Sequence, residues 1–287
     1  MHPTLRLPTP RRALLPLLLA ALVTSTPALP ARAEGVDVGK PSALRNLVPA
    51  EQIENSATQE YQALLRQAAS KRALAPADDP QVQRLRRIAD QLIPHVRPFN
   101  ARAARWQWEI NLIGSKQINA FCMPGGKIAF YTGLVDGLKL TDDEIAAVMG
   151  HEIAHALREH ARERIAKSQL TSLGAVLLGE FVGGGRYTDA FRFGGNMLTL
   201  KFSRDDESEA DVIGMELAAR GGHDPRAGVT LWQKMMAASK GEPLPWFSTH
   251  PSGNNRIAEI ERHLPQVMPI YERTQAKAEP RPAAIGR

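Results

Sequence analysis

The stretch Val148-Met149-Gly150-His151-Glu152-Ile153-Ala154-His155 carries the pattern His-Glu-x-x-His. On a helix, residues four apart lie on one face, so the rings of His151 and His155 can bind one metal ion together. Glu152 lies one residue further round the helix, beside the ion but outside its ligands. Zinc sites that hydrolyse peptides use this arrangement, with the carboxylate as general base toward water. The alternative is an ordinary helix that contains two structural histidines.

The residues around this stretch favour a helix. Thr141-Asp142-Asp143-Glu144 has the form of a capping box, with Thr141 as the N-cap and Glu144 as the third helical residue. Apolar residues then recur at helical spacing and predict a buried face. They are Ile145, Val148, Met149, Ile153 and Ala156. We expect this helix to continue to about Lys167.

A zinc site of this kind needs a third protein ligand. Ser203-Arg204-Asp205-Asp206-Glu207-Ser208-Glu209-Ala210-Asp211 places Glu207 and Asp211 four apart on a second predicted helix. One carboxylate can bind zinc while the other accepts a hydrogen bond from a ligating histidine. By spacing alone, Glu209 competes with Glu207, and a solvated acidic helix face is an equal alternative. His160 has the wrong offset for a ligand, so we expect it to support the site or the fold.

The two motifs together resemble the HtpX-like and prenyl-protease-like zinc metallopeptidases, family forty-eight of the metallopeptidases. Further matching segments are Asn119-Ala120-Phe121 with Pro124-Gly125-Gly126-Lys127-Ile128, then Gly133-Leu134, and Thr249-His250-Pro251 with Arg256-Ile257. The resemblance covers roughly residues 105–264. It is closest to a periplasmic catalytic domain, and we expect no C-terminal repeat domain of the kind that some members carry.

This resemblance implies an α+β, mostly helical gluzincin fold with a small β-sheet beside the His-Glu-x-x-His helix. It implies one Zn²⁺ per chain, with His151, His155 and Glu207 as ligands and Glu152 as general base. Asp211 would hydrogen-bond a ligating histidine. It also implies a protease for misfolded envelope proteins, with unfolded polypeptides as substrates and outer-membrane or envelope assembly factors as candidate partners.

The strand pattern predicts how such a substrate would bind. Residues 106–112 alternate between apolar and polar, and residues 117–122 and 127–131 form a predicted hairpin around Pro124-Gly125-Gly126. A sheet next to a zinc helix offers an edge to which an extended peptide can add a strand. The resemblance places Asn119, Ala120 and Phe121 at this edge.

His250 has three interpretations. It can be a structural histidine that orients its turn, or it can donate a hydrogen bond to the oxyanion formed during peptide hydrolysis. In the third interpretation it occupies the open position of zinc in a resting enzyme. We favour this blocking role, because residues 241–248 form a predicted loop on which His250 could move.

The N-terminal residues predict export. Arg6, Arg11 and Arg12 precede an apolar run from Ala13 to Val23, and Ala31-Arg32-Ala33 has the form of a cleavage site. We therefore expect a signal peptide over residues 1–33, cleaved rather than kept as an anchor. Because no cysteine follows the site, a lipoprotein is not expected. The predicted compartment is the bacterial periplasm.

The rest of the chain is divided by composition. We expect a mobile arm and a helix over residues 34–78, the catalytic domain over 79–265 and a disordered tail over 266–287. Residues 1–33 contain four arginines and no acid, so their removal lowers the formal charge from +6 to +2. No nucleic-acid partner is expected. The lone Cys122 cannot form an intramolecular disulfide and is predicted to be a packed strand residue.

Two further questions stay open at this point. The insertion at residues 170–200 can be a core helix with a loop, a movable cover over the site, or a membrane-surface contact. A rival function is a chaperone or assembly factor on a protease scaffold that is kept autoinhibited. A metal-storage module is a weaker rival, since it leaves Glu152 without a role.

Overall fold

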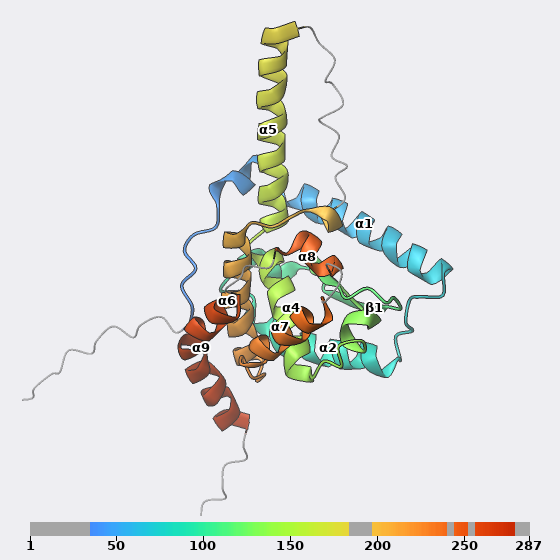
Figure 1. Ribbon diagram of the computed structural model, residues 1–287, viewed down its shortest axis with the longest axis vertical. Helices are drawn as coiled ribbons and strands as arrows, with labels where there is room; N and C mark the ends of the chain where they lie inside the picture. Colours follow the sequence, from blue (N-terminus) through green and yellow to red (C-terminus); the bar gives the residue numbers. More distant parts are fainter. Residues whose placement is uncertain (1–34, 184–196, 240–243, 252–255, 279–287) are drawn as a thin grey trace, which may run out of the picture. The chain divides into compact units, whose positions relative to one another are not determined.

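Helix α4 (Asp142–Leu157) lies in the middle of the fold. Helices α2 (Pro80–Leu92), α6 (Arg204–Arg220) and α7 (Ala227–Ala238) pack around it (Figure 1). The predicted capping box is present, because the Thr141 hydroxyl accepts from the Glu144 N–H at 3.2 Å and the Glu144 carboxylate accepts from the Thr141 N–H at 2.8 Å. The predicted α+β class, mostly helical with a small sheet, is confirmed.

The computed structural model describes residues 35–183, 197–239, 244–251 and 256–278, without the side chains of residues 172–183. The predicted signal peptide, residues 1–33, lies outside the described residues. Short elements join the main ones: η1 (Ala43–Leu47), η2 (Ile93–His95), η3 (Ala101–Arg105), α3 (Thr132–Val135) and η5 (Met197–Thr199).

The expected continuation of the α4 helix to Lys167 is wrong. Helix α4 ends at Leu157, Glu159 takes a left-handed conformation with φ of 58°, and α5 (His160–Gly183) starts in a new direction. The Glu159 carboxylate is held there by Arg45 at 3.1 Å and Arg162 at 2.8 Å. This break could not be predicted from the sequence, because neither glycine nor proline stands at it.

Three strands form the sheet, in the order β1-β3-β2. Strand β3 (Lys127–Tyr131) pairs antiparallel with β2 (Ala120–Met123) and parallel with β1 (Glu109–Ile113). The hairpin turn requires positive φ at Gly125 (85°) and Gly126 (80°), which glycine adopts without steric cost. Strand β2 is therefore an edge of the sheet, and it packs against α4.

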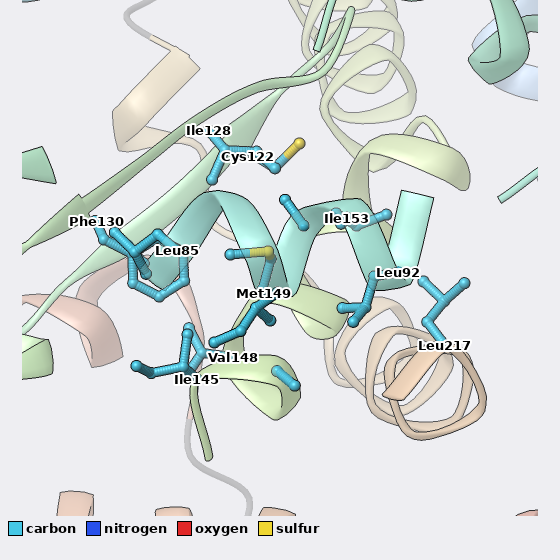
Figure 2. Close-up of a cluster of buried hydrophobic side chains, with 14 of the residues drawn as sticks. Leu85, Leu92, Cys122, Ile128, Phe130, Ile145, Val148, Met149, Ile153 and Leu217 are labelled. Carbon is cyan, nitrogen blue, oxygen red and sulfur yellow. The ribbon is translucent and has the colours of Figure 1, made fainter. Parts of the chain in front are cut away.

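The core fills the space between this sheet and the helices. Figure 2 shows side chains from α2, from the strands, from α4 and from α6 in contact with one another. Cys122 is buried among them as predicted, and burial raises the pKa of its thiol well above the usual value. The labelled members are Leu85, Leu92, Cys122, Ile128, Phe130, Ile145, Val148, Met149, Ile153 and Leu217.

The N-terminal arm is bound to the fold, contrary to the prediction that it is mobile. The Val36 N–H donates to Glu216 at 2.6 Å, and the Gly39 carbonyl accepts from Arg158 at 3.0 Å. Helix α1 (Ala50–Ser70) follows and packs on β2 and β3, where the Tyr61 hydroxyl donates to the Ile128 carbonyl at 2.5 Å. The arm is ordered because it binds Glu216 on α6 and Arg158 just after α4, which are far away in the sequence and approach the arm only in the folded chain.

The prediction of a disordered tail from residue 266 is also wrong as far as residue 278. Helix α9 (Arg256–Ala278) continues through Pro265 and Pro269. Its Val267 and Ile270 are buried in a second apolar cluster with α6, which stabilises the helix despite the prolines. Residues 279–287 lie outside the described residues.

One predicted loop contains a helix. Residues 241–248 were expected to be a loop, yet α8 (Pro245–Thr249) starts at Pro245, since proline suits the first position of a helix. In the insertion, α5 extends to Gly183, and residues 184–196 lie outside the described residues. The three interpretations of this insertion stay predictions. Among the described helices, none has the length and apolar character needed to cross a membrane.

The backbones of α4 and α6 meet at a pair of glycines. A Cβ atom on Gly150 would lie 2.6 Å from the Gly214 carbonyl oxygen, and one on Gly214 would lie 2.7 Å from the His151 nitrogen. Both separations are shorter than a methyl group tolerates, so the two helices can cross this closely only where side chains are absent. The contact lies directly beside His151.

We predict that Gly214→Ala will push the helices apart. Overpacking of this kind typically costs about 1–3 kcal/mol, and the free energy of unfolding, measured by chemical denaturation without metal, should fall by that amount or more. Metal affinity should fall with it because the His151 backbone shifts. Gly228→Ala on α7 is the matched control, since its Cβ would lie 3.5 Å from Ile260, an ordinary contact. Equal stability of the two variants would contradict the close crossing.

Candidate metal centre

The two histidines of α4 face α6. Both side chains are buried, and their Nε2 atoms lie 3.0 Å apart. Burial lowers the pKa of His155 well below the usual value, although Glu207 opposes this effect. A neutral imidazole offers the lone pair that a metal ion needs.

Helix α6 supplies the carboxylate. Ser203 caps this helix through a reciprocal pair of hydrogen bonds with Asp206. One turn in, Glu207 Oε1 lies 3.4 Å from His155 Nε2, and Glu207 Oε2 lies 3.6 Å from His151 Nε2. Glu209, which spacing alone left as a competitor, points elsewhere and accepts from Arg158 Nε at 2.6 Å.

His250 completes the cluster from the C-terminal end of α8. Its Nδ1 lies 3.0 Å from Glu207 Oε1 and 3.4 Å from His151 Nε2. Its ring stacks on Trp246, with centroids 4.5 Å apart. Burial opposes protonation of His250, but the carboxylates of Glu152 and Glu207 outweigh it and raise the pKa of the ring.

The spacing of these atoms fits one zinc ion. Tetrahedral ligands at about 2.0–2.1 Å from zinc lie about 3.3 Å from one another. The separations run from 3.0 to 3.6 Å between the two Nε2 atoms, between each of them and Glu207, and between His250 Nδ1 and both Glu207 and His151 Nε2. Within the described part of the chain, ligand atoms of His151, His155, Glu207 and His250 all lie within 4.8 Å of one another.

The charges of the buried groups also favour a bound metal ion. Glu152, Glu207 and Asp211 are three buried carboxylates, and Arg256 is the buried cation among them. With neutral imidazoles, two negative charges stay unbalanced among these buried side chains. Because buried charge is costly unless it is paired or bound to a metal, a divalent cation suits this set of residues.

Asp211 and Arg256 hold the outer side of His151. Its Nδ1 lies 3.0 Å from Asp211 Oδ1, and Arg256 donates to both Asp211 and Glu207 while its guanidinium lies 4.4 Å from the Trp232 ring centroid. Burial would raise the pKa of Asp211, but Arg256 outweighs it and lowers that pKa. Sequence reasoning missed this function of Arg256, although the residue stands in the Arg-Ile pair that carried the family resemblance.

His160 holds the outer side of His155. The two Nδ1 atoms lie 2.9 Å apart, and His160 Nε2 lies 3.2 Å from Glu209 Oε2. Sequence placed His160 only as a supporting residue, because its offset is wrong for a third histidine ligand that follows the helix after a turn. The break at Glu159 is what carries it to His155.

Glu152 lies at the inner edge of the cluster. Its Oε1 atom is buried without a hydrogen-bond partner in the described structure and lies 3.6 Å from His250 Nε2. Burial raises the pKa of Glu152, while the nearby ring of His250 opposes this rise. A buried carboxylate with one uncommitted oxygen suits proton transfer.

The predicted substrate-binding residues lie at the sheet edge. The Tyr131 N–H donates to the Asn119 carbonyl at 3.2 Å, so Asn119 and Phe121 direct their backbone groups toward β3. Ala120 and Cys122 then direct theirs toward the open edge. The Ala120 N–H donates to the Asn119 side chain at 3.0 Å, a bond that a substrate strand would displace.

Known proteins share this combination of motifs. The model of the family described as "Peptidase family M48" matches residues 79–264. The mitochondrial metalloendopeptidase OMA1 of Schizosaccharomyces pombe is 38% identical over 162 residues, which cover 56% of this chain and 48% of that protein. Metalloprotease LoiP of Escherichia coli is 29% identical over 200 residues, covering 68% of this chain and 75% of LoiP.

A third relative is the β-barrel assembly-enhancing protease of Yersinia pestis, which is 28% identical over 183 residues that cover 59% of this chain and 37% of that protein. The chain spans about a third to a half of the length of the OMA1 proteins. The family match covers well over half of the chain and includes every residue of the buried cluster. The chain therefore belongs to peptidase family M48.

Proposed function

We propose that this protein is a zinc-dependent endopeptidase that cleaves unfolded or misfolded polypeptides of the cell envelope. The observation that carries the proposal is the convergence of His151, His155 and Glu207 in one buried cluster beside Glu152. In this proposal the first three residues hold the metal and Glu152 is the general base. Asp211 and Arg256 fix His151 and Glu207.

The chemistry follows from this division of roles. Bound zinc would polarise the substrate carbonyl and lower the pKa of water. The uncommitted Oε1 of Glu152 accepts the proton of the attacking water and later returns it to the leaving amine. The raised pKa of Glu152 favours the first transfer, since a carboxylate that binds its proton more tightly is a better acceptor.

Glu152→Gln should keep the metal and lose turnover, because an amide cannot take the proton. Base catalysis typically contributes about 10²–10⁴-fold, so cleavage of unfolded casein should fall by that factor. Metal content, measured by atomic emission, separates this effect from ligand loss, which Glu207→Ala should show. Near-wild-type cleavage by zinc-loaded Glu152→Gln would sink the mechanism.

An extended substrate suits the open edge of the sheet. Strand β2 leaves the outward backbone groups of Ala120 and Cys122 on the edge, next to α4 and Glu152. Pairing through the backbone reads little side-chain identity. This supports unfolded polypeptides of varied sequence as the substrate class.

Ala120→Pro removes the outward N–H of the edge strand. We expect a raised KM or lost cleavage with zinc still bound. Ala120→Gly is the control, because it changes the side chain and keeps the donor. Circular dichroism checks that both variants fold. Identical kinetics for folded Ala120→Pro and Ala120→Gly would dismiss strand addition at this residue.

His250 supports an inhibited resting state. Its Nδ1 lies among the ligand atoms, at the corner that a catalytic water molecule would need. The same geometry favours the rival function, a chaperone or assembly factor whose protease site is kept closed. Release of His250 would then switch on cleavage.

His250→Ala distinguishes these roles. If the ring blocks the site, basal cleavage of casein at saturating zinc should rise. If the ring donates to the oxyanion, kcat should fall by about 10²–10³-fold, the typical effect of losing one such donor. We expect the rise, and a large fall would overturn the blocking role. Unchanged cleavage would return His250 to a structural function.

The proposed compartment is the bacterial periplasm. The residue pattern over 1–33 supports export, and the name of the Yersinia pestis relative links that protein to β-barrel assembly. Envelope assembly factors are therefore candidate partners, whereas membrane-surface contact rests on the residue pattern of the insertion alone. Sequencing the N-terminus of the exported protein tests this proposal, which expects a first residue at Glu34.

A further inference from the structure

We propose that His160, Glu209 and Arg158 form a hydrogen-bonded relay that positions His155 and sets the metal affinity of the site. The inference rests on the proposed function only in taking His155 as a metal ligand. His160 and Glu209 are positioning residues, because they act through His155 and touch neither metal nor substrate.

The direction of each hydrogen bond in the relay follows from the orientation of the His155 ring. His155 turns Nε2 toward the cluster, so its Nδ1 carries the proton and donates to His160 Nδ1 at 2.9 Å. His160 then carries its own proton on Nε2 and donates to Glu209 Oε2 at 3.2 Å. Every link in this order has one donor and one acceptor, and the carboxylate at its end makes the His155 ring a better electron donor.

Arg158 fixes the far end of the relay. Its Nε donates to the same Glu209 oxygen at 2.6 Å, and its other nitrogens donate to the carbonyls of Gly39 at 3.0 Å and Val38 at 3.3 Å. The Arg158 side chain is buried, so these bonds are shielded from water. The N-terminal arm therefore closes a network that leads to a metal ligand.

The left-handed conformation of Glu159, between α4 and α5, makes the contact between His160 and His155 possible. On a continuous helix, residue i+5 lies on a different face from residue i, and His160 would turn away from His155. A non-glycine residue is strained in the left-handed region, and the two arginine contacts of Glu159 help to offset this strain. The break delivers an imidazole to His155 Nδ1 from the first residue of α5.

The two ligating histidines are thus supported differently. His151 meets the carboxylate of Asp211 directly, at 3.0 Å, whereas His155 reaches a carboxylate only through a second imidazole. Glu209 is also more exposed than Asp211, with 30% of its side chain accessible against 8%. Changes at Glu209 should therefore reach the metal with less damage to the core.

The test compares two replacements of His160. Phe fills a similar space but cannot accept the His155 proton, whereas the Gln oxygen can accept it while the amide donates to Glu209. His160→Phe should weaken Zn²⁺ binding about 10–100-fold, the typical effect of losing a partner of a ligating histidine. His160→Gln should retain most of the affinity. Competition with a chelator measures both, and Co²⁺ absorption spectra should change in the Phe variant.

A second pair of variants covers a failure of His160→Phe to fold. Glu209→Gln removes the charge at the end of the relay, and Asp205→Asn makes the same change at an exposed position of the same helix. Glu209→Gln should weaken Zn²⁺ binding several-fold, and Asp205→Asn should leave it unchanged. Equal affinities for this pair, or equal losses for Phe and Gln at residue 160, would overturn the relay. Because the readout is metal affinity, its outcome is independent of whether casein is cleaved.

Discussion

The crossing of α4 and α6 at Gly150 and Gly214 is the constraint on which the site depends. Without side chains at this point, the two backbones approach within the space that a single methyl group would fill. Glu207, Asp211 and Gly214 follow one another at intervals of four and three, so they share one face of α6. The contact that brings the helices together therefore also presents both carboxylates to the histidine beside Gly150.

The site is a buried ionic network, and its stability depends on the presence of every charged partner. Such a network is destabilised when one partner is removed, because a charge is then left unpaired away from water. Arg256 connects Asp211 and Glu207 and crosses from α9 to α6. The apolar face of α9 packs on α6 in the same region, so the helix that supplies the guanidinium is held by its own hydrophobic contacts. These contacts fix the position of the Glu207 carboxylate.

Local signals in the sequence predicted the parts of the fold that local interactions determine. The capping box at Thr141 and the glycine hairpin at residues 125–126 follow from backbone chemistry within a few residues. The features that sequence missed depend on partners distant in the chain. Glu159 is held in its left-handed conformation by Arg45, which is far away in the sequence, and α9 continues past Pro265 because Val267 is buried against α6.

The candidate site likewise has parts that the sequence predicts and parts that depend on partners distant in the chain. The pattern at residues 151–155 indicates a metal site by itself, whereas the preference for Glu207 over Glu209 came from family resemblance, since their spacing is compatible with either. The structure separates them physically: Glu209 is held by Arg158 and His160, and Glu207 is left to face the histidines. A pattern of spacing contains no information on such competition between partners.

The sheet edge lies beside the carboxylate of Glu152. The N–H of Cys122 faces the unpaired edge of β2 and opposes the rise in the pKa of Glu152 that burial causes. A peptide added to this edge would be aligned by the outward groups of Ala120, two residues away on the same strand. In the proposed function, the strand that would align the substrate thus lies beside the base, and the burial of Cys122 in the main core holds that strand against α4.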